Sequence, residues 1–460
     1  MYVKNNKKNI SLLLALSLVL TGIPFPGNAR VVQATESAAK EQTPVVTSEV
    51  TETSEASQVS RLEALKAHAE TALLYGRNVE GALYPQLFVD GIDPVTKEAP
   101  IWNKFTNDKY YVSNLYGQSL LLKMMEGLTW MTEDDKYKDA AYTQVQMRYD
   151  NPALADENGL FYAGDHALLD IMTGKVMTIE HETKDDQLPV ELYYRVDPEG
   201  YERFVTAYWN AHIFDPSCLV MNRHGEFNKP LQNGDFWSSA YTNASPWIES
   251  DTAPFIVTAN DMIDLAGYLS VQTGDPKYIV WGERLLQKYI DITNEDTGLT
   301  GPQYGIMYNE DTDSRDRFIY NFAGADFVDA TGVDYKTLTE DDYEICGESM
   351  RLAKATLNST TGFGPQVYIN LYEQTGNEKY YDFVKGNMLG LVRYVYDPVR
   401  HVYKTPMSTN GTDFNPGEGN GSILVAPRAG YYLQEGQAFV ESETPNNVTL
   451  LSLIDTVHML

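Results

Sequence analysis

The sequence predicts an all-α protein built as an α/α toroid, in which paired helices surround a central cleft. Strand signals are sparse along the 460 residues, whereas apolar residues recur at spacings of three and four over long stretches. A turn of related sequence also recurs between helical stretches, which is typical of stacked helical hairpins. A ring of such hairpins accounts for both observations.

Six segments carry this helical spacing, and each would present one apolar face to a neighbouring helix. In chain order they are residues 60–74, 115–131, 261–271, 281–292, 343–357 and 367–374.

The recurring turn ends one helix and begins the next. Its first two copies run from Gln272 to Tyr278 and from Gln374 to Tyr380, and residues 132–137 form a weaker copy. In each copy an apolar helix stops at Thr-Gly or an equivalent pair, and the next helix begins near Lys-Tyr. The copies lie far apart along the chain, so the hairpins between them must have diverged.

The first 34 residues have the pattern of an export signal. A charged start is followed by an apolar run over residues 10–20 and by a small-residue cleavage site at Val32-Gln33-Ala34. The apolar run is short for a membrane span, and no comparable stretch follows it. We therefore expect residues 1–34 to be removed and the mature protein to be secreted, either to the periplasm or to the exterior.

Residues 35–58 are rich in Ser, Thr and Glu and contain no aromatic residue. Such a segment buries too little apolar surface to fold, so it is predicted to be a disordered linker. Residues 59–460 remain for one large α/α domain. Its two cysteines, Cys218 and Cys346, could form a disulfide or stay as two buried thiols.

The chain is strongly acidic, with a formal net charge of −29. This charge argues against nucleic acid and anionic membranes as partners, because both would repel it. No feature of the sequence indicates a protein partner. Aromatic residues make up 12% of the chain and include 32 tyrosines; their flat faces suit sugar rings, although core packing accounts for them equally well.

Histidines crowd together between residues 161 and 227. Four of the seven fall in this stretch, namely His166, His181, His212 and His224. Acidic residues accompany them, and a cation adjoins the last: Asp165, Glu180, Glu182, Asp215 and Arg223. Imidazoles mixed with carboxylates are typical of a divalent-metal site, so the stretch predicts such a site with a cation beside it.

Five ordered motifs resemble those of the pectate lyases in family 2 of the polysaccharide lyases. The matching residues are Gly164-Asp165-His166 with Leu169-Asp170, His181-Glu182-Thr183-Lys184, Val196-Asp197-Pro198-Glu199, Tyr208 to Asp215, and Asn222-Arg223-His224-Gly225. Weaker matches follow at Asp316-Arg317 and from Arg428 to Tyr432. Two positions depart from the family pattern, where Asp165 replaces a glycine and Asn222 replaces a serine.

The resemblance implies a single (α/α)7 barrel with a catalytic cleft between two arms. It also implies β-elimination on polygalacturonate or oligogalacturonides, assisted by a divalent transition metal. Manganese is the expected ion, with cobalt, nickel or zinc as alternatives, and calcium is not the primary one. By position the resemblance assigns His166, Glu182 and His224 as metal ligands and Arg223 as the base that takes the C5 proton.

The chemistry of this reaction asks for the same residue types. A divalent cation on the carboxylate of a 4-linked uronate withdraws charge and makes the C5 proton more acidic. Two imidazoles and one carboxylate leave positions open for substrate oxygens, and nitrogen donors favour transition metals over calcium. Arginine is an unusual base because it stays protonated in water. The residues alone therefore predict a cation that either takes the proton or stabilises the developing charge.

Competing interpretations exist for several residues near the predicted site. Glu180 and His181 compete with Glu182 as the ligand between the two outer histidines. His212 is expected to be a packed, hydrogen-bonded histidine that positions the loop after it.

Three further residues are candidates for substrate binding. Arg317 is the best of them, since a guanidinium binds a carboxylate in a bidentate manner; an ion pair with Asp313 or Asp316 is the alternative. Lys184 is a weaker candidate of the same kind. Trp209 would either stack on a sugar ring or fill the core.

Together these observations predict a secreted, metal-dependent pectate lyase. Two other functions stay open. One is another toroid enzyme acting on uronates, such as an epimerase or an unsaturated-uronyl hydrolase. The other is a non-catalytic uronan-binding protein on a lyase-like scaffold.

Overall fold

The computed structural model describes a large part of the chain. The described residues are 61–99, 110–164, 166–177, 180–183, 187–244, 247–249, 254–300, 304, 306–308, 364–397 and 402–403. All of them lie in the compact unit that spans Arg61–Leu460. The predicted export signal and linker, residues 1–34 and 35–58, lie outside the described residues, as does the predicted helix over 343–357.

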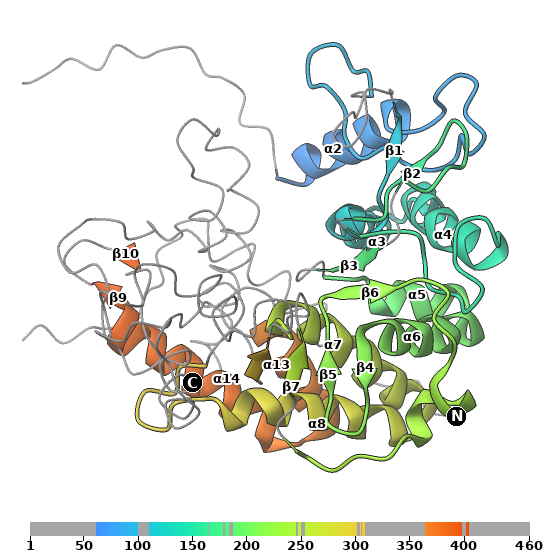
Figure 1. The fold of residues 1–460 in the computed structure, drawn as a ribbon. Coiled ribbons are helices and arrows are strands. Elements are labelled where there is room, and N and C mark those ends of the chain that lie inside the picture. Colours follow the sequence, from blue (N-terminus) through green and yellow to red (C-terminus); the bar gives the residue numbers. More distant parts are fainter. Residues whose placement is uncertain are drawn as a thin grey trace, which may run out of the picture. The chain divides into compact units, whose positions relative to one another are not determined.

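The described residues form a helix-rich fold with a few short strands (Figure 1), so the helical class is confirmed. The main helices are α2 (Arg61–Tyr75), α3 (Ser119–Thr132), α4 (Asp135–Asp150), α5 (Val190–Val196), α6 (Pro198–His212), α7 (Ile256–Thr273), α8 (Lys277–Asp291), α13 (Gly364–Thr375) and α14 (Glu378–Gly390). Short helical turns are η1 (Tyr116–Gln118), η2 (Gln232–Gly234), η3 (Phe236–Ser238) and η6 (Leu391–Val395). Within the described part of the chain, no helix is long and apolar enough to cross a lipid bilayer.

A helix occurs at each predicted segment that falls within the described residues. α2 and α13 agree closely with the predicted segments 60–74 and 367–374. α7 begins well before the predicted 261–271, because its first turn already buries Ile256 and Thr258.

Apolar spacing did not mark α4, α5, α6 or α14, although the recurring turns predicted that a helix starts at α4 and at α14. α4 is rich in charged residues and buries two polar side chains, Gln144 and Arg148, on its inner face. Hydrogen bonds to the helix backbone and to Ser113 satisfy Arg148 there. The helix also buries Tyr137, Ala140, Ala141 and Val145, but two of these are small alanines, so its apolar spacing is weak in the sequence.

The three predicted turns share one backbone geometry. The residue after each helix has a positive φ, at 71° for Gly274, 70° for Gly376 and 56° for Glu133. This left-handed residue ends the helix in each case. The prediction that the three turns stop one helix and start another is therefore confirmed.

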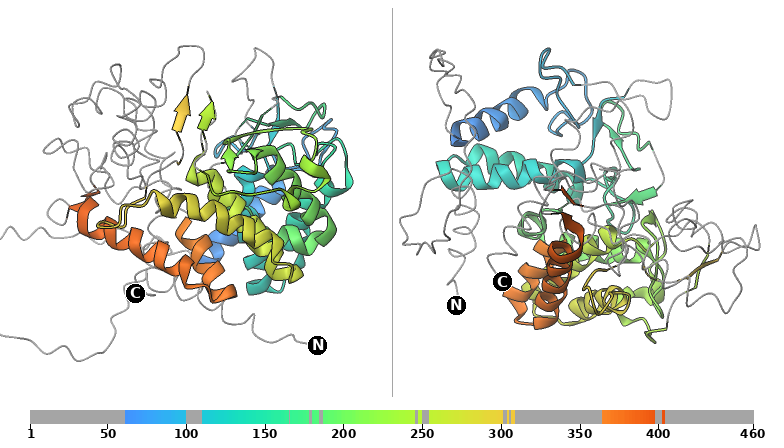
Figure 2. Two further views of the ribbon diagram at one scale, coloured as in Figure 1. Left: turned by 60° about the horizontal axis from the view of Figure 1, so that its bottom comes forward. Right: turned by 90° about the vertical axis from the view of Figure 1, so that its left-hand side faces the viewer.

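Each turn joins two helices that pack against each other. α3 packs against α4, α7 against α8, and α13 against α14. α13 also packs against α7, so the hairpin near the C-terminus lies beside one from the middle of the chain, as the views in Figure 1 and Figure 2 agree. Helical hairpins are thus confirmed, whereas closure into a toroid of seven pairs stays a prediction.

Short strands pair two by two. The antiparallel pairs are β1 (Val112–Ser113) with β2 (Leu169–Asp170), β3 (Glu180–Glu182) with β6 (His224–Glu226), β4 (Ile213–Asp215) with β5 (Val220–Met221), and β9 (Tyr396–Asp397) with β10 (Val402–Tyr403); β7 (Trp247–Glu249) runs parallel to β8 (Ile306–Tyr308). Strands of two or three residues are too short to show an alternating pattern.

The main core is rich in aromatic rings. Tyr201, Phe204 and Tyr208 of α6 are completely buried, and Trp281 of α8 packs against Phe236. Core packing therefore accounts for many of the aromatic residues, one of the two interpretations that the composition allowed.

Candidate metal centre

Two short strands bring a carboxylate and an imidazole together. In the antiparallel register of β3 and β6, Glu182 lies opposite His224, while His181 lies opposite Gly225. Directly opposite residues of an antiparallel pair project to the same side, with Cβ atoms about 5 Å apart. The pairing therefore places Glu182 and His224 side by side, and turns His181 to the other face of the ribbon.

A tight loop brings His166 to the same place. Gly164 has a φ of +115°, which side chains rarely adopt, and a Cβ there would collide with the carbonyl oxygen of Glu182. The Gly164 N–H donates to Oδ1 of Asn114 at 3.0 Å. Only glycine allows the loop to lie this close to β3.

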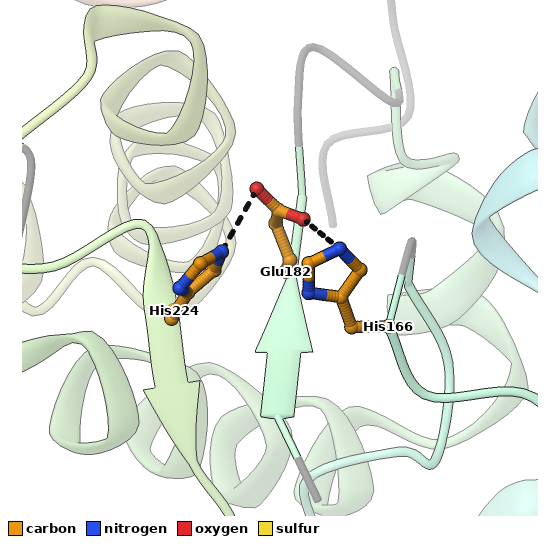
Figure 3. A group of neighbouring side chains, drawn as sticks. All are labelled: His166, Glu182 and His224. Carbon is orange, nitrogen blue, oxygen red and sulfur yellow. Dashed lines mark ion pairs between the residues drawn. The ribbon is translucent and has the colours of Figure 1, made fainter. Parts of the chain in front are cut away.

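His166, Glu182 and His224 form one cluster, and Figure 3 shows the carboxylate between the two imidazoles. Nε2 of His166 lies 3.2 Å from Oε2 of Glu182, and Nε2 of His224 lies 3.4 Å from Oε1. One ligand atom from each residue lies within 4.8 Å of the others. The structure thus brings together the three residues that the sequence selected from separate segments.

The burial and donor chemistry of this cluster fit a divalent metal ion. The Glu182 side chain is completely buried, whereas those of His166 and His224 expose 33% and 19% of their surface. Nε2 of His224 is buried and makes no hydrogen bond within the described residues. A buried polar atom without a hydrogen bond destabilises the fold unless a ligand binds to it. Two imidazoles and a carboxylate suit a transition metal and leave positions for substrate.

A second carboxylate faces the other nitrogen of each imidazole. Oε2 of Glu180 lies 3.4 Å from Nδ1 of His166 and 3.9 Å from Nδ1 of His224. A carboxylate beside Nδ1 favours the proton on that nitrogen and leaves the lone pair of Nε2 for a metal. Glu180 and Glu182, which compete as ligands in the sequence, therefore face opposite edges of the same two rings.

Arg223 lies at the edge of the cluster. Its Nη1 forms an ion pair with Oε1 of Glu182. The guanidinium carbon lies 5.4 Å from the centre of the Phe255 ring, at the start of α7. The side chain remains 29% exposed, so it reaches both the cluster and the solvent.

His181 and His212 pack in the core. Both are completely buried, and Nδ1 of His181 lies 2.7 Å from Nε2 of His212. Burial lowers the pKa of His181 well below its usual range and that of His212 to about 4, so both rings are neutral near pH 7. The expectation of a packed, hydrogen-bonded His212 is confirmed, and His181 does not join the ligand cluster.

The prediction that Trp209 contacts substrate is wrong. Its indole is completely buried, donates its N–H to the carbonyl oxygen of Met262 at 3.0 Å, and packs against Phe236 and Trp237. A ring enclosed in this way cannot stack on a sugar. Trp209 fills the core, which is the other role that the sequence allowed.

Several residues singled out in the sequence lie outside the described residues. They are Asp165, Lys184, Arg317 and Cys346. The proposed roles of Lys184 and Arg317 in substrate binding stay predictions. Cys218 lies 3.7 Å from a carboxylate oxygen of Asp215.

The sequence did not reveal the residues that support the site. Asn114 holds the Gly164 loop from 50 positions earlier in the chain, and Tyr116 contacts His181 from 65 positions earlier. Phe255 reaches Arg223 from the start of α7. No local pattern marks these residues, because their contacts arise only when distant segments pack together.

Comparison with known proteins identifies one matching enzyme family. Residues 85–459 match the model of a family described as periplasmic pectate lyase. The matched part contains the whole cluster and every helix from α3 onward.

A pectate disaccharide-lyase of Dickeya dadantii (strain 3937) is 28% identical to this chain over 254 residues. The alignment covers 53% of this chain and 46% of that enzyme. The chain thus spans about half the length of the curated relative that it matches.

Two solved structures align over most of the chain at low similarity. A sugar epimerase from a ruminal bacterium has a TM-score of 0.37 and 13% identity, covering 87% of this chain and 99% of its own. The cellobiose 2-epimerase of Spirochaeta thermophila has a TM-score of 0.34 and 13% identity, covering 86% of this chain and 97% of its own. TM-scores of this size do not establish a common fold.

Proposed function

This chain belongs to the periplasmic pectate lyase family, and from that membership we propose that it cleaves α-1,4-polygalacturonate by metal-assisted β-elimination. The family match and the pectate disaccharide-lyase relative support a polysaccharide lyase. The observation that carries the finer proposal is the cluster of His166, Glu182 and His224 with Arg223 at its edge.

His166, Glu182 and His224 are proposed to hold a divalent transition metal. Manganese is our first choice, with cobalt, nickel or zinc as alternatives, because calcium prefers oxygen ligands. When bound, the ion withdraws charge from the uronate carboxylate and so makes the neighbouring C5 proton more acidic. Glu180 supports this role because its carboxylate, 3.4 Å from Nδ1 of His166, favours the Nδ1 proton on that ring.

Arg223 is proposed to take the C5 proton. In the reaction the C5–H bond and the bond from C4 to the glycosidic oxygen break, and a C4–C5 double bond forms. The departing chain keeps the oxygen and gains a proton. A base must lie within about 3 Å of the proton that it takes. A guanidinium serves as base only where the site favours its neutral form, and its alternative role is to stabilise charge developing on the uronate.

The remaining proposals concern parts of the chain outside the described residues. Arg317 and Lys184 are proposed to bind carboxylates of the substrate, because an acidic chain needs local cations to hold a polyanion. Residues 1–34 are proposed to direct export, so that the enzyme meets its substrate outside the cytoplasm. The helical hairpins are proposed to close into an (α/α)7 barrel.

The primary test measures the absorbance of unsaturated products when purified protein acts on polygalacturonate. Activity should require Mn²⁺ and disappear after exhaustive chelation. His224→Ala should lose both bound metal and activity, because it removes a ligand. Arg223→Ala should retain metal and lose about 100-fold or more in kcat, the scale of a lost general base. Glu226→Gln, an exposed change on the same strand as His224, is the control and should leave both unchanged.

Arg223→Lys separates the two roles proposed for the arginine. A lysine that only stabilises charge should support activity at neutral pH, because its ammonium is protonated there. A lysine that acts as the base should become active only as the pH rises toward its pKa. The pH profile of kcat distinguishes these outcomes.

Three results would contradict the proposed function. Activity on a related uronan but not on polygalacturonate would show that the substrate is wrong. Activity that survives complete chelation would favour an epimerase or an unsaturated-uronyl hydrolase. Calorimetric binding of oligogalacturonides without turnover, at several pH values and with several metals, would identify a non-catalytic binding protein.

A further inference from the structure

A buried row of hydrogen bonds runs beside the candidate metal centre. The Tyr116 hydroxyl lies 2.9 Å from Nε2 of His181, and Nδ1 of His181 lies 2.7 Å from Nε2 of His212. Nδ1 of His212 in turn lies 2.7 Å from the carbonyl oxygen of Asn222. The tyrosine and both imidazoles are almost completely buried. The mechanism proposed above uses none of these three side chains.

The carbonyl of Asn222 sets the direction of the whole row. A carbonyl oxygen can only accept, so Nδ1 of His212 carries a proton. Nε2 of the neutral His212 ring then accepts from the Nδ1–H of His181. Nε2 of His181, left with its lone pair, accepts from the Tyr116 hydroxyl. One acceptor at the end thus fixes both tautomers, and neither ring can turn over without breaking a buried hydrogen bond.

The two imidazoles also pack against the strands that carry the ligands. His181 belongs to β3, next to Glu182, and lies opposite Gly225 of β6. A Cβ at Gly225 would come within 2.8 Å of Nε2 of His212, so the ring of His212 lies against the β6 backbone. A shift of either ring would therefore move the strand pair in which Glu182 faces His224.

The row ends at the residue that precedes Arg223. The Asn222 N–H donates to the carbonyl oxygen of His212 at 2.9 Å, and Oδ1 of Asn222 accepts the N–H of His224 at 3.0 Å. His212 thus holds Asn222 through both backbone and side chain, and Asn222 holds His224. The segment that carries the guanidinium is fixed on both sides.

We propose that His181 and His212 are positioning residues, which hold Glu182 and His224 in the arrangement that binds the metal and keep Arg223 beside them. This inference rests on the proposed function, because the arrangement matters only if the cluster binds an ion. Apolar side chains of similar volume would fill the same space without burying polar atoms. The oriented hydrogen bonds therefore point to a requirement for fixed ring orientation beyond space filling.

The test compares metal affinity with stability in variants of the full chain. His212→Phe keeps a ring and removes both of its hydrogen bonds, and Tyr116→Phe removes only the hydroxyl at the far end. We would measure Mn²⁺ dissociation constants by calorimetry well below the melting temperature, and the melting temperature of the metal-free proteins. His212→Phe should bind Mn²⁺ about 10- to 100-fold more weakly, the effect typical of residues that orient ligands. Tyr116→Phe should show a smaller loss.

Two further variants separate positioning from packing. Tyr201→Phe is the matched control for Tyr116→Phe, because its buried hydroxyl donates to the Leu265 carbonyl and contacts no cluster residue. It should lower the melting temperature to a similar extent and leave Mn²⁺ affinity unchanged. His212→Asn keeps an N–H where Nδ1 lies, so it should bind Mn²⁺ more tightly than His212→Phe.

Unchanged Mn²⁺ affinity in His212→Phe, with a lower melting temperature, would assign the row to packing alone and overturn the inference while the proposed function stands. Failure of the unaltered protein to bind Mn²⁺ would overturn the metal centre and the inference together. If His212→Phe does not fold, Tyr116→Phe and His212→Asn decide the question, and affinity equal to that of the unaltered protein in both would overturn it.

Discussion

Glu182 is the residue on which the candidate site most depends. Its carboxylate is completely buried, faces an imidazole on each side and forms an ion pair with Arg223. A buried carboxylate is stable only when cations or hydrogen-bond donors surround it. Arg223 supplies a cation here, and the imidazoles of His166 and His224 flank the carboxylate from two other segments of the chain. Glu182 therefore contacts both of these segments from β3.

Glu180→Gln is predicted to weaken Mn²⁺ binding by about 10-fold, because a neutral amide favours the Nδ1 proton of His166 less strongly than a carboxylate does. Glu226 lies opposite Glu180 in the β3–β6 pair and is exposed. Glu226→Gln therefore removes the same charge from the same ribbon and serves as the control in titration calorimetry. If both variants weaken Mn²⁺ binding equally, Glu180 acts only through its charge and not by orienting the histidines.

His212 should make the stability of the fold depend on pH. Burial lowers its pKa to about 4 in the folded protein, from the ordinary value of about 6.5 in the unfolded chain. The unfolded state therefore binds more protons between these values. The free energy of unfolding is therefore not reduced by His212 above pH 6.5, and it decreases as the pH falls toward 4. Melting temperatures of His212→Gln should fall less steeply over that window than those of the unaltered protein, and parallel curves would refute the assignment.

The helical elements are joined by turns that repeat one set of local hydrogen bonds. The side chain of the residue after the left-handed position accepts the N–H two residues later, at 3.0 Å from Asp275, 3.1 Å from Asn377 and 3.2 Å from Asp134. The last threonine of each preceding helix bonds back to a carbonyl four residues earlier. Because these contacts are local, short stretches of sequence predicted the turns.

Gly274→Ala is predicted to destabilise the fold by about 1 kcal/mol, because a side chain disfavours the left-handed backbone at a φ of 71°. Gly127→Ala, inside α3, should instead raise stability by up to about 1 kcal/mol, because alanine favours the helix. An added Cβ meets nothing within 4 Å at either position, so the pair isolates backbone conformation from packing. Thermal melting should shift in opposite directions, and shifts of the same sign would contradict the turn geometry.

The whole molecule carries a formal charge of −29, and its proposed substrate is also an anion. Long-range repulsion between them slows encounter, and only local cations such as Arg223 oppose it. The site therefore has a local positive charge in a chain whose net charge is negative.

Added salt should therefore raise kcat/KM on polygalacturonate, because screening weakens the repulsion between enzyme and substrate. Initial rates at low substrate concentration, measured over a series of NaCl concentrations, test this. A neutral solute at matched osmolality is the control and should have no effect. A steep decline of kcat/KM with salt would show that attraction by local cations dominates association.

The accuracy of the sequence predictions follows the distance over which each contact acts. α2, α7 and α13 were predicted because their apolar spacing is a local property. For α4 only the start was predicted, from the turn before it, because part of its buried face consists of Gln144 and Arg148. The choice of His166, Glu182 and His224 came from ordered motifs. Trp209 was assigned to substrate wrongly, because an aromatic motif does not show which face of a helix is enclosed.

By itself, the sequence determined the helical class, the recurring turns, the family and the residue types of the candidate metal site, since each depends on neighbours in the chain or on ordered motifs. Only the tertiary structure decided that Glu182 faces the Nε2 atoms while Glu180 faces Nδ1, and that His181 points into the core. Adjacent residues of a strand project to opposite sides, so their roles depend on what each side packs against. That packing involves Asn114, Tyr116 and Phe255, which meet the site only after distant segments have folded together.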